Sequence, residues 1–481
     1  MKYCSNSRCL VRQQNDGLAE YHDSLEVCPE CGASLTSNIP IDQKLSHSLW
    51  KRTFISLGVL AVCLAARQIP LPTVIPKADF GDGSMAGWSI MALGVGPLLS
   101  GYLLVEFAAL IVPAWRPLRV GGPAGRAKLH RAALITGMVL ALPQALVFTI
   151  ALETTGVTRN YDGGFRVITV LTLVGATGAL VALARILDRE GLGGGFSILL
   201  LANLVPQIVG PLGSAFLHAT SGAIPFSVLV NGVFVVAVLA GATLWMFSPF
   251  RLPAGNDFPH PALVSRPACG VAPFTTVAAM LGVAAAWARM NTHGHPLGPE
   301  LFSSKLPAAL FLGVGAAMFF AFLFNRPDQI ARTWKSLSPN SPEGIPPLNA
   351  VMLESLLFII LLVLAEAWAV RHSGNYSANT VATLLATGIV CDLAREWRAR
   401  EADPHLTPVW EIHQTYAVAP TMRMLEAEGI HAFAKGARLR ALLQFFGPYV
   451  PVEILVSAKD AERAHALMQE RWPRADGDGN Q

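Results

Sequence analysis

Apolar residues form long blocks along this chain, and short polar segments separate the blocks. A helix that crosses a membrane needs about 20 predominantly apolar residues, and ten blocks come close to this length. They lie at roughly 50–69, 88–112, 132–152, 166–187, 196–213, 224–247, 268–288, 306–325, 349–370 and 378–396. The pattern predicts an all-α polytopic membrane protein with ten transmembrane helices.

The composition agrees with this interpretation. Hydrophobic residues make up 52% of the 481 residues and charged residues 14%, whereas about 25% charged residues is typical of soluble domains. The first 45 residues are polar and contain cysteines, so we expect no cleavable signal peptide and a retained first helix. The net charge of +4 does not indicate nucleic acid as a partner.

Positive charge is distributed unevenly between the predicted loops. With the N-terminus inside, the inner segments near helix ends carry 18 Lys and Arg residues, and the outer segments carry 7. Cytoplasmic loops are the ones enriched in Lys and Arg. Because an even number of spans places both termini on one side, we expect both termini in the cytoplasm.

Residues 1–40 contain two cysteine pairs. Cys4 and Cys9 are separated by four residues, and Cys28 and Cys31 by two. Two such pairs supply four thiolates for a tetrahedral Zn²⁺ site, with His22 as an alternative ligand. Disulfides and free thiols are the other interpretations, but the cytoplasm keeps thiols reduced. We expect a zinc ribbon with a structural Zn²⁺.

Residues 408–472 have the pattern of a separate small α+β domain. A strand, a helix, two strands and a final helix follow one another, and this β-α-β-β-α order favours such a fold. The segments "LEAEGI", "PVEILV" and "AERA" resemble, in this order, a prokaryotic family of signal-transducing protein domains. That resemblance identifies no catalytic residues and implies a docking domain for another protein.

The second and seventh apolar blocks share an interruption near their starts. The motif is "ALGVGP" at 92–97 and "ACGVAP" at 268–273. Ten spans divide into two halves of five, and matching interruptions in two halves indicate an inverted repeat with a central working site. We therefore expect helix breaks at Gly94, Pro97, Gly270 and Pro273.

Glu106 is an ionisable residue inside the second block. Such a residue at membrane depth usually faces a partner or water. The alternative is a hydrogen-bonded neutral acid, and the sequence leaves both interpretations open.

Six segments in the correct order resemble SecY, the protein-conducting channel of the general secretion pathway, over about 53–400. They are "RQIPLP" at 67–72, "SIMALGVGPLLSGYLLVE" at 89–106, "PAGRAKLHR" at 123–131, "DREGLGGGFSILL" at 188–200, "FAFLFNRPDQIARTWK" at 320–335 and "ATLLATGIVCDLAREW" at 382–397. We therefore expect a SecY-like ten-helix domain at 49–400, built as two inverted five-helix repeats.

The resemblance implies an hourglass pore between the two halves, sealed at its waist by a ring of apolar side chains. By resemblance the ring positions are Val95, Leu99, Leu200, Leu204, Thr275 and Leu385, and the cytoplasmic loop before the third helix contains Gly125, Arg126 and Lys128. The implied surroundings are membrane lipid, translocating polypeptides and a SecE-like accessory helix protein, in the bacterial cytoplasmic (inner) membrane.

The chain also departs from the family. The connection at 75–87 is too short for the family's plug helix, and the connection at 248–267 lacks the basic hairpin offered to ribosomes and to the SecA motor. The segment "EGIPPL" at 343–348 has prolines where the family has an arginine, and Thr275 is polar within the ring. These departures predict altered cytoplasmic partners, of unknown identity, at the terminal domains.

The sequence therefore predicts a SecY-like protein-conducting channel for translocation across, or insertion into, the cytoplasmic membrane. The alternative is a non-conducting SecY-derived regulator or sensor, and the repeat alone would also suit a secondary transporter. An enzyme is not expected, because the chain lacks H-E-x-x-H and G-x-S-x-G motifs. The "HGH" at 293–295 is a weak metal signal in a predicted loop.

Overall fold

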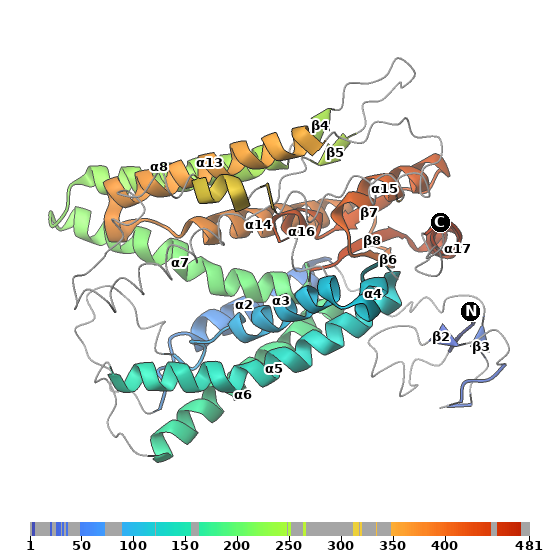
Figure 1. The fold of residues 1–481 in the computed structure, drawn as a ribbon, viewed down its shortest axis with the longest axis horizontal. Helices are drawn as coiled ribbons and strands as arrows, with labels where there is room; N and C mark the ends of the chain where they lie inside the picture. The colour runs from blue at the N-terminus through green and yellow to red at the C-terminus, as the bar shows by residue number, and fades with distance from the viewer. Residues whose placement is uncertain are drawn as a thin grey trace.

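A computed structural model describes a large part of the chain. The described residues are 2–4, 20–21, 26–29, 31–32, 35–36, 49–72, 89–120, 122–154, 163–247, 249–251, 263–265, 311–316, 318–319, 333, 348–443 and 450–472. Most helices run along the long axis of the molecule and together form a helical body (Figure 1). Its principal helices are α2 (Leu49–Ala66), α3 (Gly96–Ile111), α4 (Arg116–Val120), α5 (Gly122–Thr154), α6 (Gly163–Glu190), α7 (Gly195–Thr220), α8 (Phe226–Met246), α13 (Leu348–Ser373) and α14 (Thr380–Ala402).

Six helices within the described residues are long and apolar enough to cross a membrane. They are Leu49–Ala66, Gly125–Glu153, Gly163–Glu190, Gly195–Thr220, Phe226–Met246 and Leu356–Ser373. A seventh span results if Gly96–Ile111 is joined to Pro113–Arg119, which is bent away from it by 105°. The predicted span at 268–288 lies outside the described residues and the one at 306–325 largely so, and the count of ten stays a prediction.

Helices α5 and α14 continue into charged segments beyond their predicted apolar blocks. α5 begins ten residues before the predicted start at 132, and α14 continues to Ala402, past the predicted end at 396. Both extensions are rich in charged side chains, such as Arg126 in α5 and Arg400 in α14. Polar helix turns that continue beyond the apolar segment are invisible to a pattern based on hydropathy.

Helices α3 and α5 pack closely against each other in the helical body. A Cβ atom added to Gly101 would lie 2.6 Å from the Ala133 carbonyl oxygen and 2.6 Å from Gly137 Cα. Glycine at both positions therefore lets the two backbones approach, a device common in membrane helices. Around this contact, buried residues of α2, α3, α5, α6, α7, α8, α13 and α14 form one apolar core.

The C-terminal domain consists of residues 406–472 and has a three-stranded antiparallel sheet. Its elements are β6 (Leu406–Ile412), α15 (Val418–Ala427), β7 (Ala432–Lys435), α16 (Ala437–Leu442), β8 (Val452–Ser457) and α17 (Ala461–Arg471). The strand order is β6-β8-β7. The short helix α16 was absent from the expected element order, and its leucines join the apolar core of the helical body.

Two smaller sheets complete the described residues. β4 (Pro249–Arg251) pairs antiparallel with β5 (Leu263–Ser265) in the connection after α8. Near the N-terminus, β1 (Lys2–Cys4) lies between β2 (Glu20–Tyr21) and β3 (Leu35–Thr36). These N-terminal strands and the C-terminal domain lie toward the same end of the helical body (Figure 1).

Candidate functional site

The interrupted segment before α3 packs directly against α7. Residues 89–95 form turns, and α3 begins at Gly96 with Pro97 in its first turn. Gly94 has a φ of +50°, and a Cβ atom there would lie 2.9 Å from the Oδ1 atom of Asn203 on α7. Glycine is thus required both by the left-handed backbone and by the close approach. Non-helical backbone at membrane depth occurs where it is buried in protein or lines a cavity.

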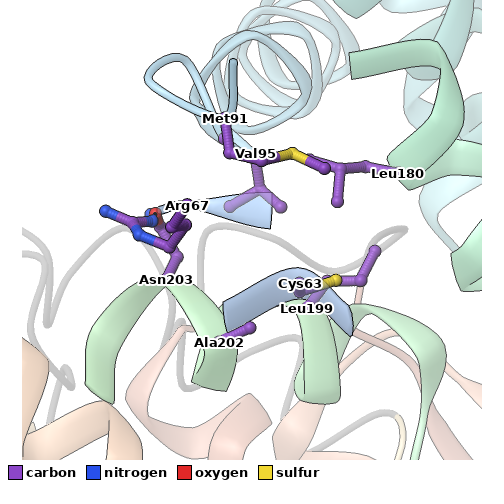
Figure 2. A pocket seen from close by; sticks show the side chains of 9 residues that line it. Cys63, Arg67, Met91, Val95, Leu180, Leu199, Ala202 and Asn203 are labelled. Atoms are coloured by element: carbon purple, nitrogen blue, oxygen red, sulfur yellow. Dashed lines mark hydrogen bonds between the residues drawn. The ribbon is translucent and has the colours of Figure 1, made fainter. Parts of the chain in front are cut away.

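A small cavity of about 20 Å³ lies between this turn, α2, α6 and α7 (Figure 2). Such a volume holds about one water molecule. Its lining residues are Cys63, Arg67, Met91, Gly94, Val95, Leu180, Leu199, Ala202 and Asn203. Nη1 of Arg67, just after the end of α2, donates a hydrogen bond to Oδ1 of Asn203.

The sequence pattern does not identify Arg67 or Asn203 as site residues. The available signal was that each is a polar residue inside or beside an apolar block, with Asn203 directly before the ring position Leu204. Their contact ties the end of α2 to α7 beside the interrupted segment.

All predicted ring positions within the described residues belong to the apolar core of the helical body or pack against it. Val95 at the start of α3, Leu200 and Leu204 on α7, and Leu385 on α14 are buried members of the same apolar core, and the partly buried Leu99 packs against it. The predicted residues Gly270, Pro273 and Thr275 lie outside the described residues.

Glu106 on α3 has charged and polar partners. Its side chain is fully buried, and its Oε1 atom lies 2.8 Å from Nη2 of Arg119 on α4 and 3.1 Å from Nε2 of His413. His413 follows β6 in the C-terminal domain, so the carboxylate in the second block contacts a partner 307 residues away. Of the two interpretations that the sequence left open, the partnered carboxylate is the one observed.

The electrostatics of this cluster follow from its burial. Burial lowers the pKa of His413, although Glu106 opposes this, so His413 is neutral near pH 7 and its Nε2–H donates to Glu106. Arg440 on α16 donates from Nη2 to the His413 carbonyl oxygen at 2.8 Å. Burial lowers the pKa of Arg440 to about 10, so it stays charged.

A second contact joins α5 to the C-terminal domain. Arg126 forms an ion pair with Glu411 of β6. The sequence placed Gly125, Arg126 and Lys128 in a loop, but the structure places them in the first turns of α5. The reason is local: α4 folds back onto α5, and a Cβ atom on Gly125 would lie 3.0 Å from the Leu118 carbonyl carbon.

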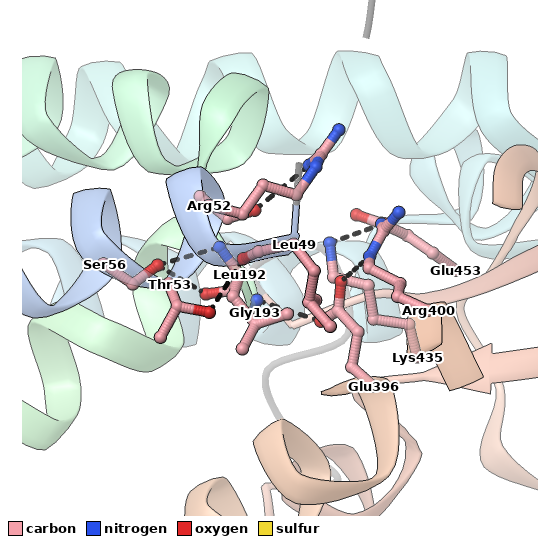
Figure 3. Close-up of polar contacts among 11 residues, drawn as sticks. Leu49, Arg52, Thr53, Ser56, Leu192, Gly193, Glu396, Arg400, Lys435 and Glu453 are labelled. Atoms are coloured by element: carbon pink, nitrogen blue, oxygen red, sulfur yellow. Dashed lines mark hydrogen bonds and ion pairs between the residues drawn. The ribbon is translucent and has the colours of Figure 1, made fainter. Parts of the chain in front are cut away.

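The glycine-rich connection between α6 and α7 is held from one side by α2 (Figure 3). Arg52 donates from Nη1 to the Gly191 carbonyl oxygen at 3.2 Å. The Ser56 hydroxyl donates to the Leu192 carbonyl oxygen and accepts from the Leu192 N–H, both at 2.8 Å. Paired backbone groups of this kind fix the conformation of a turn that would otherwise be variable.

The same connection is held from the other side by α14. The Gly193 N–H donates to Oε2 of Glu396 at 2.9 Å, and the other carboxylate oxygen accepts from Nε of Arg400 at 2.8 Å (Figure 3). Arg400 lies beside the ion pair of Lys435 on β7 and Glu453 on β8, whose charged atoms are 3.0 Å apart. Burial alone would lower the pKa of Lys435, but Glu453 more than reverses this and the pKa is raised.

Asp392 on α14 anchors α16 of the C-terminal domain. Its carboxylate accepts the N–H groups of Leu439 at 2.8 Å and Arg438 at 3.2 Å. One turn earlier, a Cβ atom on Gly388 would lie 2.6 Å from the Leu442 side chain. Asp392, Glu396 and Arg400 were missed as site residues, although their spacing of four on a largely apolar helix was a visible sign of one polar face.

Of the two predicted cysteine pairs in the N-terminal region, only Cys28 and Cys31 both lie within the described residues. Gly32 has a φ of +67° and donates its N–H to the Cys28 carbonyl oxygen at 2.9 Å, which closes a tight turn around Cys28 and Cys31. Cys4 lies in β1, opposite Leu35 of β3. Cys9 and His22 lie outside the described residues, and no group of three metal-binding side chains occurs among those described.

Comparison with known proteins places these features in a family. Residues 89–253 match the profile of the SecY family. The chain is 28% identical over 211 residues to the protein translocase subunit SecY of Pseudomonas aeruginosa, covering 40% of this chain and 48% of that protein. It is 28% identical over 218 residues to the Vibrio cholerae protein of the same description, covering 41% and 48%. The chain spans about half the length of the curated relatives it matches.

Solved structures with a similar fold agree. A SecY structure concerned with the plug domain has a TM-score of 0.51 at 12% identity, covering 76% of this chain and 96% of that one. Sec61 in a canine ribosome-channel complex has a TM-score of 0.51 at 13% identity, with the same coverage. Residues 89–253 are therefore similar to the SecY family, and the fold of the chain is that of SecY and Sec61. The SecY family is not one of enzymes, as the sequence predicts.

A second profile matches outside the SecY region. Residues 410–471 match a family described as "Putative prokaryotic signal transducing protein". The chain therefore combines a SecY-like region at 89–253 with a second, unrelated match at 410–471.

Proposed function

We propose that this protein is a SecY-like protein-conducting channel, which translocates polypeptides across the bacterial cytoplasmic membrane or inserts them into it. The observation that carries the proposal is that Val95 on the interrupted segment, Leu200 and Leu204 of α7 and Leu385 of α14 are all buried in the one apolar core of the helical body. Apolar constrictions close a pore to ions because water leaves them, and flexible leucine side chains are able to move apart around a chain.

The geometry favours a closed constriction. The cavity beside Val95 has a volume of about 20 Å³, which is room for about one water molecule. A polypeptide therefore passes only when the helices that carry the ring positions, α7 in the first half and α14 in the second, separate.

We further propose altered cytoplasmic partners. The C-terminal domain occupies the end of the helical body where α5 begins and α14 ends, with both termini on the cytoplasmic side. The profile match at 410–471 supports a docking role for an unidentified cytoplasmic protein. Membrane lipid and a SecE-like accessory helix protein are the proposed neighbours within the membrane, because relatives are subunits of a protein translocase.

The second candidate function is a non-conducting regulator that retains the channel fold. The contacts of Glu106 and Arg126 with the C-terminal domain favour it, because they connect a domain of signal-transducing type directly to α3 and α5. The ion conductance of the Leu200→Gly variant in planar bilayers distinguishes a channel from a non-conducting regulator.

Photo-cross-linking tests the proposed function. We expect a photoreactive residue placed at Leu200 to label exported precursor proteins in living cells, because Leu200 would contact the chain in transit. Labelling restricted to neighbouring helices of the same protein would favour the regulator.

Residues 1–40 are proposed to bind one structural Zn²⁺ through Cys4, Cys9, Cys28 and Cys31. The tight turn closed by Gly32 supports this, since backbone N–H groups in such a turn are placed near the thiolates. We expect the purified protein to contain one zinc per chain by elemental analysis, and Cys28→Ser to lose it. Cys63→Ser, on the buried face of α2, is the control and should retain it. Equal zinc in both variants would contradict the site.

A further inference from the structure

We propose that the C-terminal domain is a clamp that joins the two five-helix halves of the helical body, so that the halves separate only when the clamp detaches. The proposal rests on the proposed function, which supplies the reason for the halves to move. The clamp is defined here as residues 406–472.

The clamp contacts the first half through two charged groups, of which Glu106 is buried and Arg126 is partly buried. Glu106 on α3 is fully buried and accepts a hydrogen bond from His413 of the clamp. Arg126 on α5 pairs with Glu411 of β6, which leads directly into His413. Both contacts come from helices before α8, and therefore from the first five predicted spans.

The clamp contacts the second half through α14 and α8. Asp392 accepts two N–H groups of α16, and Leu442 of α16 packs against Gly388. The Arg438 guanidinium lies 5.1 Å from the centre of the Phe247 ring at the end of α8. Helix α16 therefore sits on the second half, while β6 sits on the first, within a domain held together by its own core.

Apolar and polar contacts contribute differently to the attachment of the clamp. Leu439 and Leu442 are fully buried in the core of the helical body, and their exposure on detachment opposes release. The Arg126–Glu411 ion pair and the Glu106–His413 hydrogen bond add little net attraction, because these polar groups are solvated once released, but they fix one orientation of the domain. Such an interface is held firmly, yet a competing protein that satisfies the same charged groups is able to displace it.

The clamp is also connected to the helix that carries two ring positions. Glu396 on α14 accepts the Gly193 N–H at the start of the turn before α7, and through Arg400 it faces Lys435 and Glu453 of the clamp (Figure 3). A clamp that detaches removes charge partners from Arg400 and loosens the support of this turn. Release at the domain surface is thereby transmitted toward Leu200 and Leu204.

Hydrogen exchange of the full-length protein in lipid nanodiscs tests the clamp. Arg126→Glu places two carboxylates opposite each other and should detach the clamp. We expect about tenfold faster exchange or more at the amides of Leu439 and Gly193, because a tenfold change corresponds to about 1.4 kcal/mol of opening free energy. The double variant R126E/E411R should restore slow exchange.

Two further variants test the contact with the second half and provide a control. Asp392→Asn weakens the anchor on the second half without introducing a new charge, and it should accelerate the same amides. Arg166→Glu breaks an exposed ion pair with Glu153 that involves no residue of the clamp, and it should leave both amides unchanged. Faster exchange confined to 406–472, with Gly193 unaffected, would overturn the proposal.

A distance measurement reports on the halves themselves. Spin labels at the exposed positions Lys128 on α5 and Arg398 on α14 should give one narrow distance distribution in the unmodified protein. Arg126→Glu should broaden or lengthen it, and an unchanged distribution would overturn the proposal. Neither experiment requires a translocating chain. If Arg126→Glu releases the clamp but Leu200 cross-links no precursor protein, only the proposed function is refuted. If Leu200 cross-links precursors but Arg126→Glu changes neither the exchange at Gly193 nor the distance between the halves, only the clamp is refuted.

Discussion

Replacing Gly101 with leucine is expected to prevent the helical body from folding stably. A side chain here would enter the contact between α3 and α5, where a Cβ atom would already be 2.6 Å from the Ala133 carbonyl oxygen and from Gly137 Cα. Overpacking typically costs about 1–3 kcal/mol when neighbouring side chains are able to move. Backbone atoms form this contact, so we expect the upper end of that range or more, seen as a collapse of the monodisperse peak in size-exclusion chromatography and a lower melting temperature.

Gly175 on α6 provides the matched control for this variant. It is also a helical glycine, but nothing lies within 4 Å of an added Cβ atom. Gly175→Leu should therefore fold as well as the unmodified protein, since leucine is the better helix former. Equal behaviour of the two leucine variants would show that α3 and α5 do not approach as closely as described.

Replacing Leu200 with glycine is expected to raise the ion conductance of the purified protein severalfold in planar bilayers. Leu200 is buried at the proposed constriction beside Leu199 and Leu204. Its removal leaves space in the apolar seal, and water that enters such a constriction carries ions with it. A sealed variant would instead favour the non-conducting regulator.

Leu171 on the exposed face of α6 is the control for the conductance experiment. Its side chain is 65% exposed, so Leu171→Gly imposes the same cost of about 1 kcal/mol on a helix without touching the constriction. Conductance that rises equally in both variants would indicate general loosening of the protein and not an opened seal.

Much of the helical body was predictable from the sequence because burial in lipid and helix formation both leave a pattern in hydropathy. The blocks at 50–69 and 224–247 correspond closely to α2 and α8. The start of α3 was also visible in advance, since Gly94 and Pro97 interrupt the block, and the contact of Gly94 with Asn203 now supplies the reason.

The connection between the helical body and the C-terminal domain was not predictable. The partners of Glu106 and Arg126 lie 307 and 285 residues further along the chain. A single sequence indicates that a buried carboxylate needs a partner, but it does not indicate which distant residue meets it. The same holds for Asp392, whose partners are backbone N–H groups of a six-residue helix that has no periodic pattern to reveal it.

Site-specific photo-cross-linking from Leu200 in living cells tests most directly whether this protein conducts polypeptides. The photoreactive residue is placed at Leu200, and at the exposed position Leu171 as the matched control. Protein export is then slowed so that precursors remain in transit. We predict covalent products between Leu200 and secretory precursors that are absent from Leu171. Products that contain only neighbouring helices, or equal labelling of precursors from both positions, would contradict a channel through this constriction.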